Sequence, residues 1–233
     1  MDGGTKLVKV DAALLECSEK YPGFAYPWGD LEAFLDSAGL VSLPLVGYGS
    51  LINRESAGRT IDVDGAADRK AVKAFGALRV FNYRMPAKML EQRYGTPANS
   101  KYVAALNCEV SGKTVDQFNG ILTHVGRDRL DALRERERAY SLKPVVYHSW
   151  DKPEEALSPA YILELLPDGR GGSNPYDTSI FPHQAYTRLC QEGASAVSAE
   201  FLSFFNDTCF LADKITRLSN YSLPEHESQA LEQ

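Results

Sequence analysis

The chain has 233 residues, 44% hydrophobic and 24% charged, which is the composition of an ordinary globular protein with one or two domains. Its formal net charge of −6 and its lack of a basic stripe argue against nucleic acid or an anionic membrane as the main partner. No run approaches the roughly 18–20 apolar residues of a membrane helix, and the first residues lack the apolar core of a secretory signal. We therefore expect a cytoplasmic protein.

The cysteines and histidines indicate neither disulfides nor a metal site. The four cysteines are Cys17, Cys108, Cys190 and Cys209. The four histidines are His124, His148, His183 and His226. The cysteines form no C-x-x-C pair and the histidines show no metal-ligand spacing, so we expect buried reduced thiols and no bound metal.

The first 40 residues precede the first buried strand, and we expect them to form an N-terminal extension. Within this extension, residues 30–39 predict one short helix, with Asp30 as a possible N-cap and Gly39 as a C-terminal stop.

From Leu43 onward, the pattern changes to strands and then to helices. Runs rich in β-branched and aromatic residues predict strands at residues 43–51, 70–84, 102–110, 118–125, 143–150 and 159–166. Helical spacing predicts helices at residues 128–142, 182–194 and 197–208, the last two separated near Gly193. Because strands and helices do not alternate regularly, the order favours an α+β fold over a doubly wound α/β sheet.

We expect one main domain over residues 41–215, followed by a polar C-terminal tail over residues 216–233. Two segments look irregular, at residues 85–101 and 167–182. Loops of this length in a compact domain often act as lids or binding loops.

The first predicted strand ends in an unusual way, at Gly47, Tyr48, Gly49 and Ser50. Glycine weakens a strand unless the backbone must bend or let another group come close. The stretch does not match known phosphate or nucleophile loops, because Ile52 stands where G-x-G-x-x-G needs glycine, and no G-K-[ST] follows. G-x-S-x-G would need glycine in place of Tyr48, so a serine hydrolase is also disfavoured.

The charged run R-E-R-E-R holds two glutamates that a helical wheel separates. At about 100° per residue, Leu130, Leu133 and Tyr140 form an apolar stripe. Glu137 falls inside this stripe and Glu135 falls on the opposite side. A carboxylate that faces the core is a candidate general acid/base or one half of a buried ion pair with an arginine, and the residues alone leave both open.

Together, the stretches VGYGSLI and, about 85 residues later, LDALRERERAY resemble the γ-glutamylcyclotransferase family, which includes the glutathione-specific ChaC-type enzymes. The family's Y-G-S loop falls on residues 48–51 and its R-E-x-x-Y motif on residues 136–140, which places the acid/base glutamate on Glu137. Residues 182–194 resemble the family's P-x-x-Y-x-x-x-I-x-x-G-A helix, with Tyr186 in the tyrosine position.

This resemblance implies an α+β fold in which helices surround a small mixed β-barrel-like sheet. It implies an enzyme that converts a γ-glutamyl amino acid or glutathione to 5-oxoproline and releases an amine or amino acid, without metal or cofactor. The catalytic residue would be Glu137. The substrate-binding residues would be Tyr48, Gly49, Ser50, Leu51 and Tyr186.

In this interpretation, Gly47 and Gly49 let the backbone approach a small polar ligand, and loop N–H groups face its carboxylate or carbonyl oxygen. Two alternatives stay open: a non-catalytic small-molecule-binding module on the same fold, and a relative that acts on γ-glutamylamines. The sequence also leaves the oligomeric state open.

Overall fold

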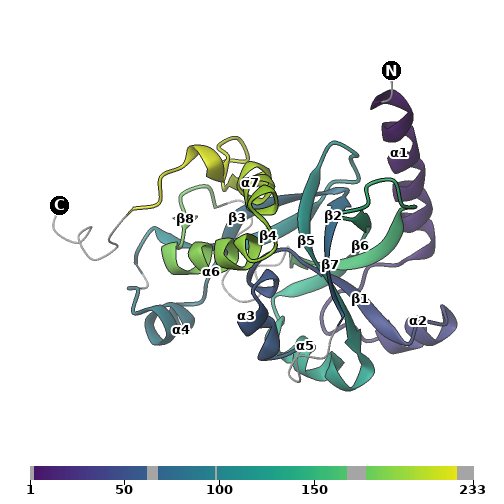
Figure 1. Cartoon of the computed structure of the whole chain (residues 1–233). Helices are drawn as coiled ribbons and strands as arrows, with labels where there is room; N and C mark the ends of the chain where they lie inside the picture. Colours follow the sequence, from purple (N-terminus) through teal and green to yellow (C-terminus); the bar gives the residue numbers. More distant parts are fainter. Residues whose placement is uncertain (1–2, 62–67, 98, 167–176, 225–233) are drawn as a thin grey trace.

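The computed structural model describes residues 3–61, 68–97, 99–166 and 177–224 (Figure 1). Their strands form a closed barrel in the order β1-β5-β2-β6-β7 and a four-stranded sheet in the order β8-β4-β3-β9. Helices pack around both sheets, so the predicted α+β fold with a small barrel is confirmed. No helix in these ranges is long and apolar enough to cross a membrane.

The barrel consists of β1 (Ser42–Gly47), β2 (Arg69–Phe75), β5 (Gln117–Gly126), β6 (Tyr140–Ser149) and β7 (Ser158–Leu165). Its neighbours are antiparallel except for β1 and β7, which meet in parallel where Leu45 pairs with Tyr161. Leu43, Leu45 and Tyr161 are fully buried, in line with the apolar runs that predicted these strands.

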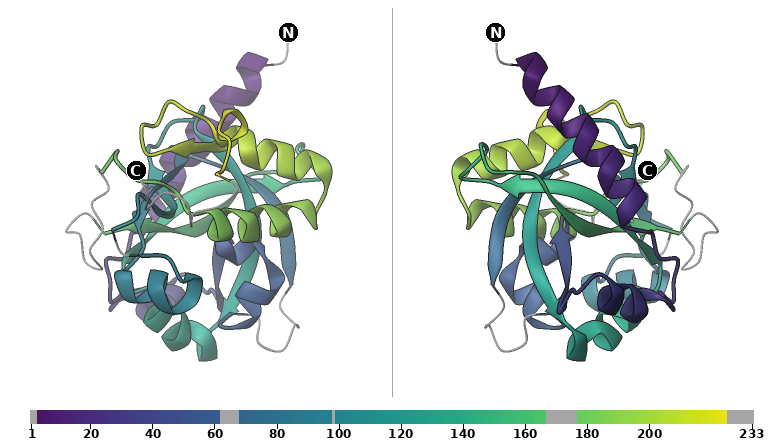
Figure 2. Two further views of the ribbon diagram at one scale, coloured as in Figure 1. Left: turned by 90° about the vertical axis from the view of Figure 1, so that its left-hand side faces the viewer. Right: turned by 90° about the vertical axis from the view of Figure 1, so that its right-hand side faces the viewer.

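The second sheet consists of β3 (Ala77–Arg84), β4 (Tyr102–Val110), β8 (Phe181–Pro182) and β9 (Cys209–Leu211). The run predicted at residues 70–84 divides between the sheets at Gly76, whose φ of +92° lets the chain turn sharply. Helices α6 (Gln184–Ser195) and α7 (Ala199–Thr208) pack against each other, and α7 also packs on β5 (Figure 2).

The N-terminal extension contains α1 (Gly3–Lys20) and α2 (Leu31–Ser37). Helix α1 lies along β6 (Figure 2) and was not predicted, although Val10 and Cys17 are seven residues apart and both are buried. Helix α2 was predicted. It ends before Gly39, whose φ is +65°, whereas its N-cap residue, Asp30, makes no side-chain capping bond.

Part of this extension belongs to the main hydrophobic core. Trp28, Leu31 and Leu35 are fully buried and pack in the same cluster as the barrel residues. At the other end of the chain, η4 (Leu218–Asn220) contributes a buried Leu218, whereas residues 225–233 of the predicted tail lie outside the described residues.

Several predicted boundaries are wrong. The helix predicted at residues 128–142 is shorter, with η3 (Arg127–Arg129) followed by α5 (Leu130–Arg136). The last two helices separate after Ser195, close to the predicted position near Gly193, and each begins two residues later than predicted.

The two segments predicted to be irregular have different outcomes. The one at residues 85–101 contains α4 (Ala87–Met89) and the π-helical turn η2 (Leu90–Tyr94). The other, at residues 167–182, lies outside the described residues from 167 to 176.

Candidate active site

Strand β1 leaves the barrel at Gly47 and passes into η1 (Ser50–Ile52), so the Tyr48-Gly49-Ser50-Leu51 loop lies at the end of a core strand. A Cβ on Gly47 would lie 2.6 Å from Leu51 Cβ, and a Cβ on Gly49 would lie 2.5 Å from the Tyr186 hydroxyl. Glycine is therefore needed at both positions, because any side chain there would collide with Leu51 or with the Tyr186 hydroxyl. The approach of a ligand to the loop backbone, for which the sequence analysis expected these glycines, stays a prediction.

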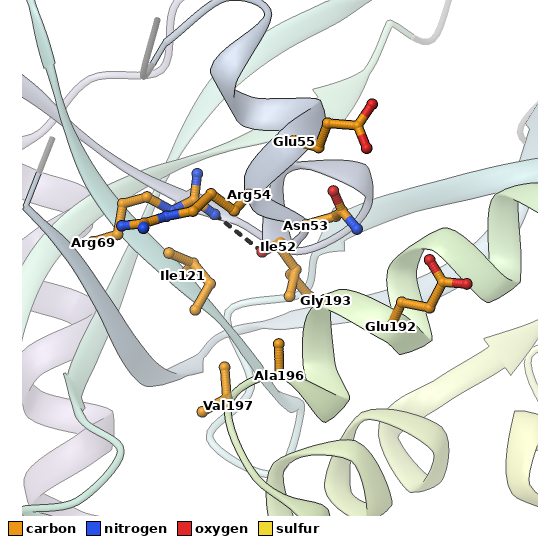
Figure 3. Close-up of a pocket in the computed structure, with 10 residues that line it drawn as sticks. All are labelled: Ile52, Asn53, Arg54, Glu55, Arg69, Ile121, Glu192, Gly193, Ala196 and Val197. Carbon is orange, nitrogen blue, oxygen red and sulfur yellow. Dashed lines mark hydrogen bonds between the residues drawn. The ribbon is translucent and has the colours of Figure 1, made fainter. Parts of the chain in front are cut away.

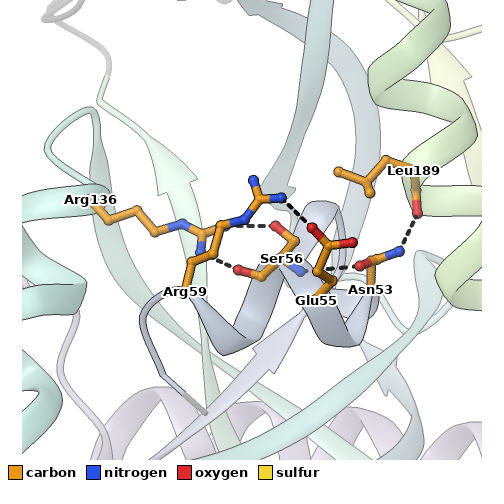
Figure 4. A network of polar contacts seen from close by, with 6 residues as sticks. All are labelled: Asn53, Glu55, Ser56, Arg59, Arg136 and Leu189. Atoms are coloured by element: carbon orange, nitrogen blue, oxygen red, sulfur yellow. Dashed lines mark hydrogen bonds and ion pairs between the residues drawn. The ribbon is translucent and has the colours of Figure 1, made fainter. Parts of the chain in front are cut away.

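Helices α6 and α3 (Arg54–Gly58) pack against the same loop. A Cβ on Gly193 would lie 2.6 Å from the backbone nitrogen of Asn53, so α6 reaches the loop at van der Waals distance. The Asn53 side chain accepts from the Ser56 N–H at 3.1 Å and donates to the Leu189 carbonyl at 3.4 Å (Figure 4). This cap at the start of α3 fixes the chain directly after η1.

Three arginines from three elements hold the polar atoms of the loop. Arg79 of β3 donates to the Tyr48 carbonyl at 3.2 Å. Arg69 of β2 donates to the carbonyls of Leu51 and Ile52 at 2.7 and 3.0 Å. Arg136 of α5 reaches the Ser50 hydroxyl at 3.3 Å. Because C=O and N–H point in opposite directions across a trans peptide, fixed carbonyls also fix the direction of the N–H groups.

The N–H groups of Gly49, Ser50 and Leu51 find no acceptor within the part of the chain that the structure describes. In contrast, the N–H groups of Ile52 and Asn53 bond back to Gly49 and Ser50 at 2.9 and 3.2 Å. Three consecutive open donors at the start of a helical turn are an arrangement that can stabilise a developing negative charge on oxygen.

The two tyrosines of the predicted site have hydroxyls that bond to the protein itself. Tyr48 donates to the Leu163 carbonyl at 2.6 Å, and the Tyr186 hydroxyl bonds to the backbone of Leu106 and to the Cys190 thiol. Burial raises the pKa of both tyrosines well above the usual range, so they stay neutral. The structure places Tyr186 against Gly49, and a contact of its hydroxyl with substrate stays a prediction.

Glu137 follows the last residue of α5, at the C-cap position, with φ −105° and ψ 37°. Its N–H bonds to the Leu133 carbonyl at 2.9 Å and its carbonyl accepts from the Tyr140 N–H at 3.0 Å, which closes a tight turn into β6. The wheel was wrong to extend the helix through Tyr140. Its inward direction for Glu137 is right, since the side chain is 12% exposed against 67% for Glu135.

Arg136 joins this carboxylate to the glycine loop. Its Nε lies 2.9 Å from Glu137 Oε1, and its Nη1 donates to the Thr60 hydroxyl at 3.0 Å. Nη1 also donates to the Ser56 carbonyl at 2.8 Å (Figure 4). Together with the contact to Ser50, one guanidinium thus links α5, α3 and η1. The structure therefore brings Glu137 and the loop together, and it also contains the arginine ion pair that the sequence left as an alternative.

Burial raises the pKa of Glu137 above its ordinary value, and the charge and hydrogen bond of Arg136 oppose this rise only in part. The Glu137 charge in turn contributes to the raised pKa of Tyr48 and Tyr140. A glutamate shifted in this direction can exchange a proton closer to neutral pH, as a general acid/base requires.

Sequence reasoning missed Arg79, the fully buried arginine of β3. Its guanidinium also donates to the Asn119 carbonyl at 2.8 Å and to the Thr208 hydroxyl at 2.8 Å, and it lies 4.1 Å from the ring centre of Phe205. The available signal was a single arginine within the otherwise apolar strand ALRVF.

A separate surface pocket of about 510 Å³ lies next to the loop (Figure 3). It shares Ile52 and Asn53 with the loop region and reaches Arg69 and the end of α6, but neither Glu137 nor Tyr186 lines it. Within the described ranges, histidine, cysteine and acidic side chains do not gather in any group of three or more that could hold a metal ion. All four cysteines are buried and unpaired, as predicted.

Comparison with known proteins supports the fold. No family model and no curated protein matches the sequence. YkqA from Bacillus subtilis has a similar structure, with 16% identity and a TM-score of 0.50 over 74% of this chain and 55% of YkqA. This chain thus spans about half the length of YkqA, and the likeness shows the fold alone.

Two weaker likenesses have lower TM-scores. At5g39720.1 from Arabidopsis thaliana is 15% identical with a TM-score of 0.40, over 72% of this chain and 91% of that protein. A yeast γ-glutamyl cyclotransferase specific to glutathione is 15% identical with a TM-score of 0.37, over 55% of this chain and 70% of that enzyme.

Proposed function

We propose that this protein is a γ-glutamylcyclotransferase that converts a γ-glutamyl compound to 5-oxoproline and releases an amine or amino acid. The observation that carries the proposal is the joint placement of Glu137 and the Tyr48-Gly49-Ser50-Leu51 loop by one arginine, Arg136. These are the two features on which the sequence resemblance rests, and they lie about 85 residues apart in the chain.

In the proposed reaction, the substrate's own α-amine attacks its γ-carbonyl carbon and closes a five-membered ring. Glu137 takes one proton from the ammonium group, so that the free amine can attack, and the same nitrogen loses a second proton as the ring forms. Glu137 returns its proton to the leaving nitrogen as the γ-amide bond breaks, and the second proton also ends there, so the product departs as an ammonium group and Glu137 is ionised again. The N–H groups of Gly49, Ser50 and Leu51 stabilise the tetrahedral oxyanion. Nucleophile and electrophile belong to one molecule, so the protein supplies the curled conformation and the proton transfer.

The substrate-binding residues in this proposal are Tyr48, Gly49, Ser50, Leu51 and Tyr186. Tyr48 and Tyr186 act as neutral walls, and the loop contributes its backbone. Glutathione, γ-glutamyl amino acids and γ-glutamylamines all carry the same γ-glutamyl head, and each is a candidate substrate. A cytoplasmic location, and neither nucleic acid nor membrane as partner, are part of the same proposal.

The alternative function is a non-catalytic module that binds a small molecule at the same loop. The observation that favours it is the Arg136–Glu137 ion pair at 2.9 Å, because a carboxylate with such a partner is satisfied without any reaction. The raised pKa of Glu137 favours the enzyme, since an arginine partner alone would lower it.

The test is incubation of the purified full-length protein with glutathione, γ-glutamyl-alanine and a γ-glutamylamine, with 5-oxoproline measured by mass spectrometry. We expect 5-oxoproline from at least one compound, and the rates rank the substrates. Activity should survive dialysis against EDTA; loss on chelation with return on metal addition would contradict the metal-free mechanism. Binding without product would support the non-catalytic module.

A further inference from the structure

Residues 21–40 of the N-terminal extension lie against the segment from η3 to the start of β6, which contains Glu137. Trp28 is fully buried and its indole N–H donates to the Tyr140 carbonyl at 3.0 Å. Two backbone bonds, of 2.8 and 2.9 Å, join Phe24 to Leu142. These contacts hold the first residues of β6, directly after the turn that contains Glu137.

The same extension also holds the 3₁₀ turn before α5 and the last turn of α5. Arg127 Nη2 lies 2.8 Å from Asp36 Oδ1 and 2.9 Å from the Leu40 carbonyl. Arg134 Nη2 lies 3.1 Å from Glu32 Oε1. The segment from η3 to the start of β6 is therefore fixed by the extension on both sides of Glu137.

The turn is also held by backbone contacts of its own, among them the pairing of Tyr140 with Leu165 of β7. Glu137 bonds through its own carbonyl to the Tyr140 N–H, and the neighbouring Ala139 carbonyl accepts from Leu166 at 2.8 Å. The Tyr140 carbonyl thus accepts from the Trp28 indole, and the Tyr140 N–H donates to the Glu137 carbonyl, so a shift at Tyr140 moves the Glu137 backbone. Trp28 has a φ of 62°, a conformation that a bulky residue rarely adopts and that indicates a constrained position.

We infer that residues 21–40 position the proposed catalytic carboxylate, and that Trp28 is a positioning residue acting on Glu137 through the Tyr140 carbonyl. This inference rests on the proposed function for its kinetic consequence. Its structural content, the placement of the Glu137 carboxylate by the extension, can be tested without turnover.

The first test is Trp28→Phe in the full-length protein, which keeps an aromatic ring and removes the N–H donor. Because small misplacements of a catalytic group are costly, we expect kcat to fall on the order of 10- to 100-fold while KM stays within about twofold. The matched control is Val10→Ala in α1, which also removes buried volume but packs against Phe75 and Val146, in a separate cluster. Val10→Ala should lower the thermal midpoint and leave kcat unchanged.

A second variant covers the case in which Trp28→Phe does not fold. Arg127→Gln removes the contacts to Asp36 and Leu40 at a partly exposed position, so the core stays intact. We expect a smaller fall in kcat, with KM again unchanged. If both folded variants keep the wild-type kcat while their midpoints fall as in Val10→Ala, the extension is merely structural and the inference is overturned.

An activity-independent readout separates this inference from the proposed function. Titration of the Glu137 carboxyl carbon by ¹³C NMR should give a lower pKa in Trp28→Phe and Arg127→Gln than in wild type, because a displaced side chain gains water. The charged or titratable groups that act on it, Arg136, Tyr48 and Tyr140, are the same in all the proteins compared. An inactive wild type with these shifts would refute the cyclotransferase and keep the positioning; unchanged titration would overturn the positioning.

Discussion

The last turn of α5 and the turn that follows it each contain a glutamate from the same charged run, one exposed to solvent and the other largely buried. Glu135 of α5 pairs with Arg138 beyond the helix end, and both side chains are more than 60% exposed. Glu137 in the turn pairs with Arg136, the last residue of α5, and their side chains are 12% and 23% exposed. Each is an ion pair drawn from the same five-residue run of alternating charges.

The difference comes from where the helix ends. Exposed ion pairs contribute about 0–1 kcal/mol and are screened by salt. A carboxylate removed from water instead acquires a raised pKa, which Arg136 only partly offsets. The residue at which the helix ends must therefore be known before each charged residue of such a run can be assigned to solvent or to a site.

The largest expected effect is on Glu137. Glu137→Gln keeps the shape but cannot accept a proton, so kcat should fall by roughly 10²–10⁴-fold, the usual contribution of general acid–base catalysis. Because the folded pKa is raised, the protonated side chain stabilises the fold at low pH, and this stability is lost as pH rises through the folded pKa. The thermal midpoint of the variant should therefore rise relative to wild type between acidic and neutral pH. Full turnover in the folded variant would contradict this assignment.

The next largest effect concerns the glycine loop. Gly49→Ala would place a Cβ 2.5 Å from the Tyr186 hydroxyl, so we expect a loss of about 1–3 kcal/mol in unfolding free energy, as for other overpacked sites. Adding Tyr186→Phe should recover part of this loss. The matched control is Gly58→Ala in α3, whose Cβ would meet no atom within 4 Å and should stabilise by about 0.5–1 kcal/mol. Equal losses at the two glycines, measured by urea unfolding, would remove the close contact as an explanation.

The pH dependence of activity separates the two glutamates further. Since Glu137 must be ionised to accept a proton, kcat/KM should fall on the acid side with a midpoint above the ordinary range of a glutamate. Arg136 opposes the shift, so Arg136→Gln should move the acid limb to higher pH if the fold is kept. A limb at the ordinary glutamate value in wild type would indicate a solvated carboxylate.

The smallest effect is expected at Glu135. Its side chain is 67% exposed, so Glu135→Gln should change the unfolding free energy by no more than about 0.5 kcal/mol. Turnover should stay near that of wild type. Guanidinium unfolding and a 5-oxoproline assay check both points, and a large loss of turnover would mean that the wrong glutamate has been assigned.

Much of the fold could be predicted because its signals are local. The strand predicted at residues 102–110 coincides with β4, and α6 and α7 lie within two residues of their predicted starts. The predicted helix at residues 128–142 was too long because Tyr140, which continues the helical spacing, instead pairs with Leu165 in the barrel. Tertiary pairing overrode the local period at this point.

The parts of the site that could not be predicted depend on contacts between distant residues. Trp28 meets Tyr140 across 112 positions and Arg79 meets Tyr48 across 31. Neither arrangement follows from spacing in the sequence. The sequence drew attention to Gly49, but the close contact of its Cβ position with the Tyr186 hydroxyl involves a helix residue 137 positions further along.

The most direct measurement compares wild type, Glu135→Gln and Glu137→Gln in one assay of 5-oxoproline release, using whichever γ-glutamyl compound wild type converts fastest. Thermal midpoints recorded on the same samples verify that all three are folded. We expect 5-oxoproline from wild type and Glu135→Gln, and none above background from a folded Glu137→Gln. Absence of 5-oxoproline with every γ-glutamyl compound, or equal release by Glu137→Gln and wild type, would contradict a cyclotransferase that works through Glu137.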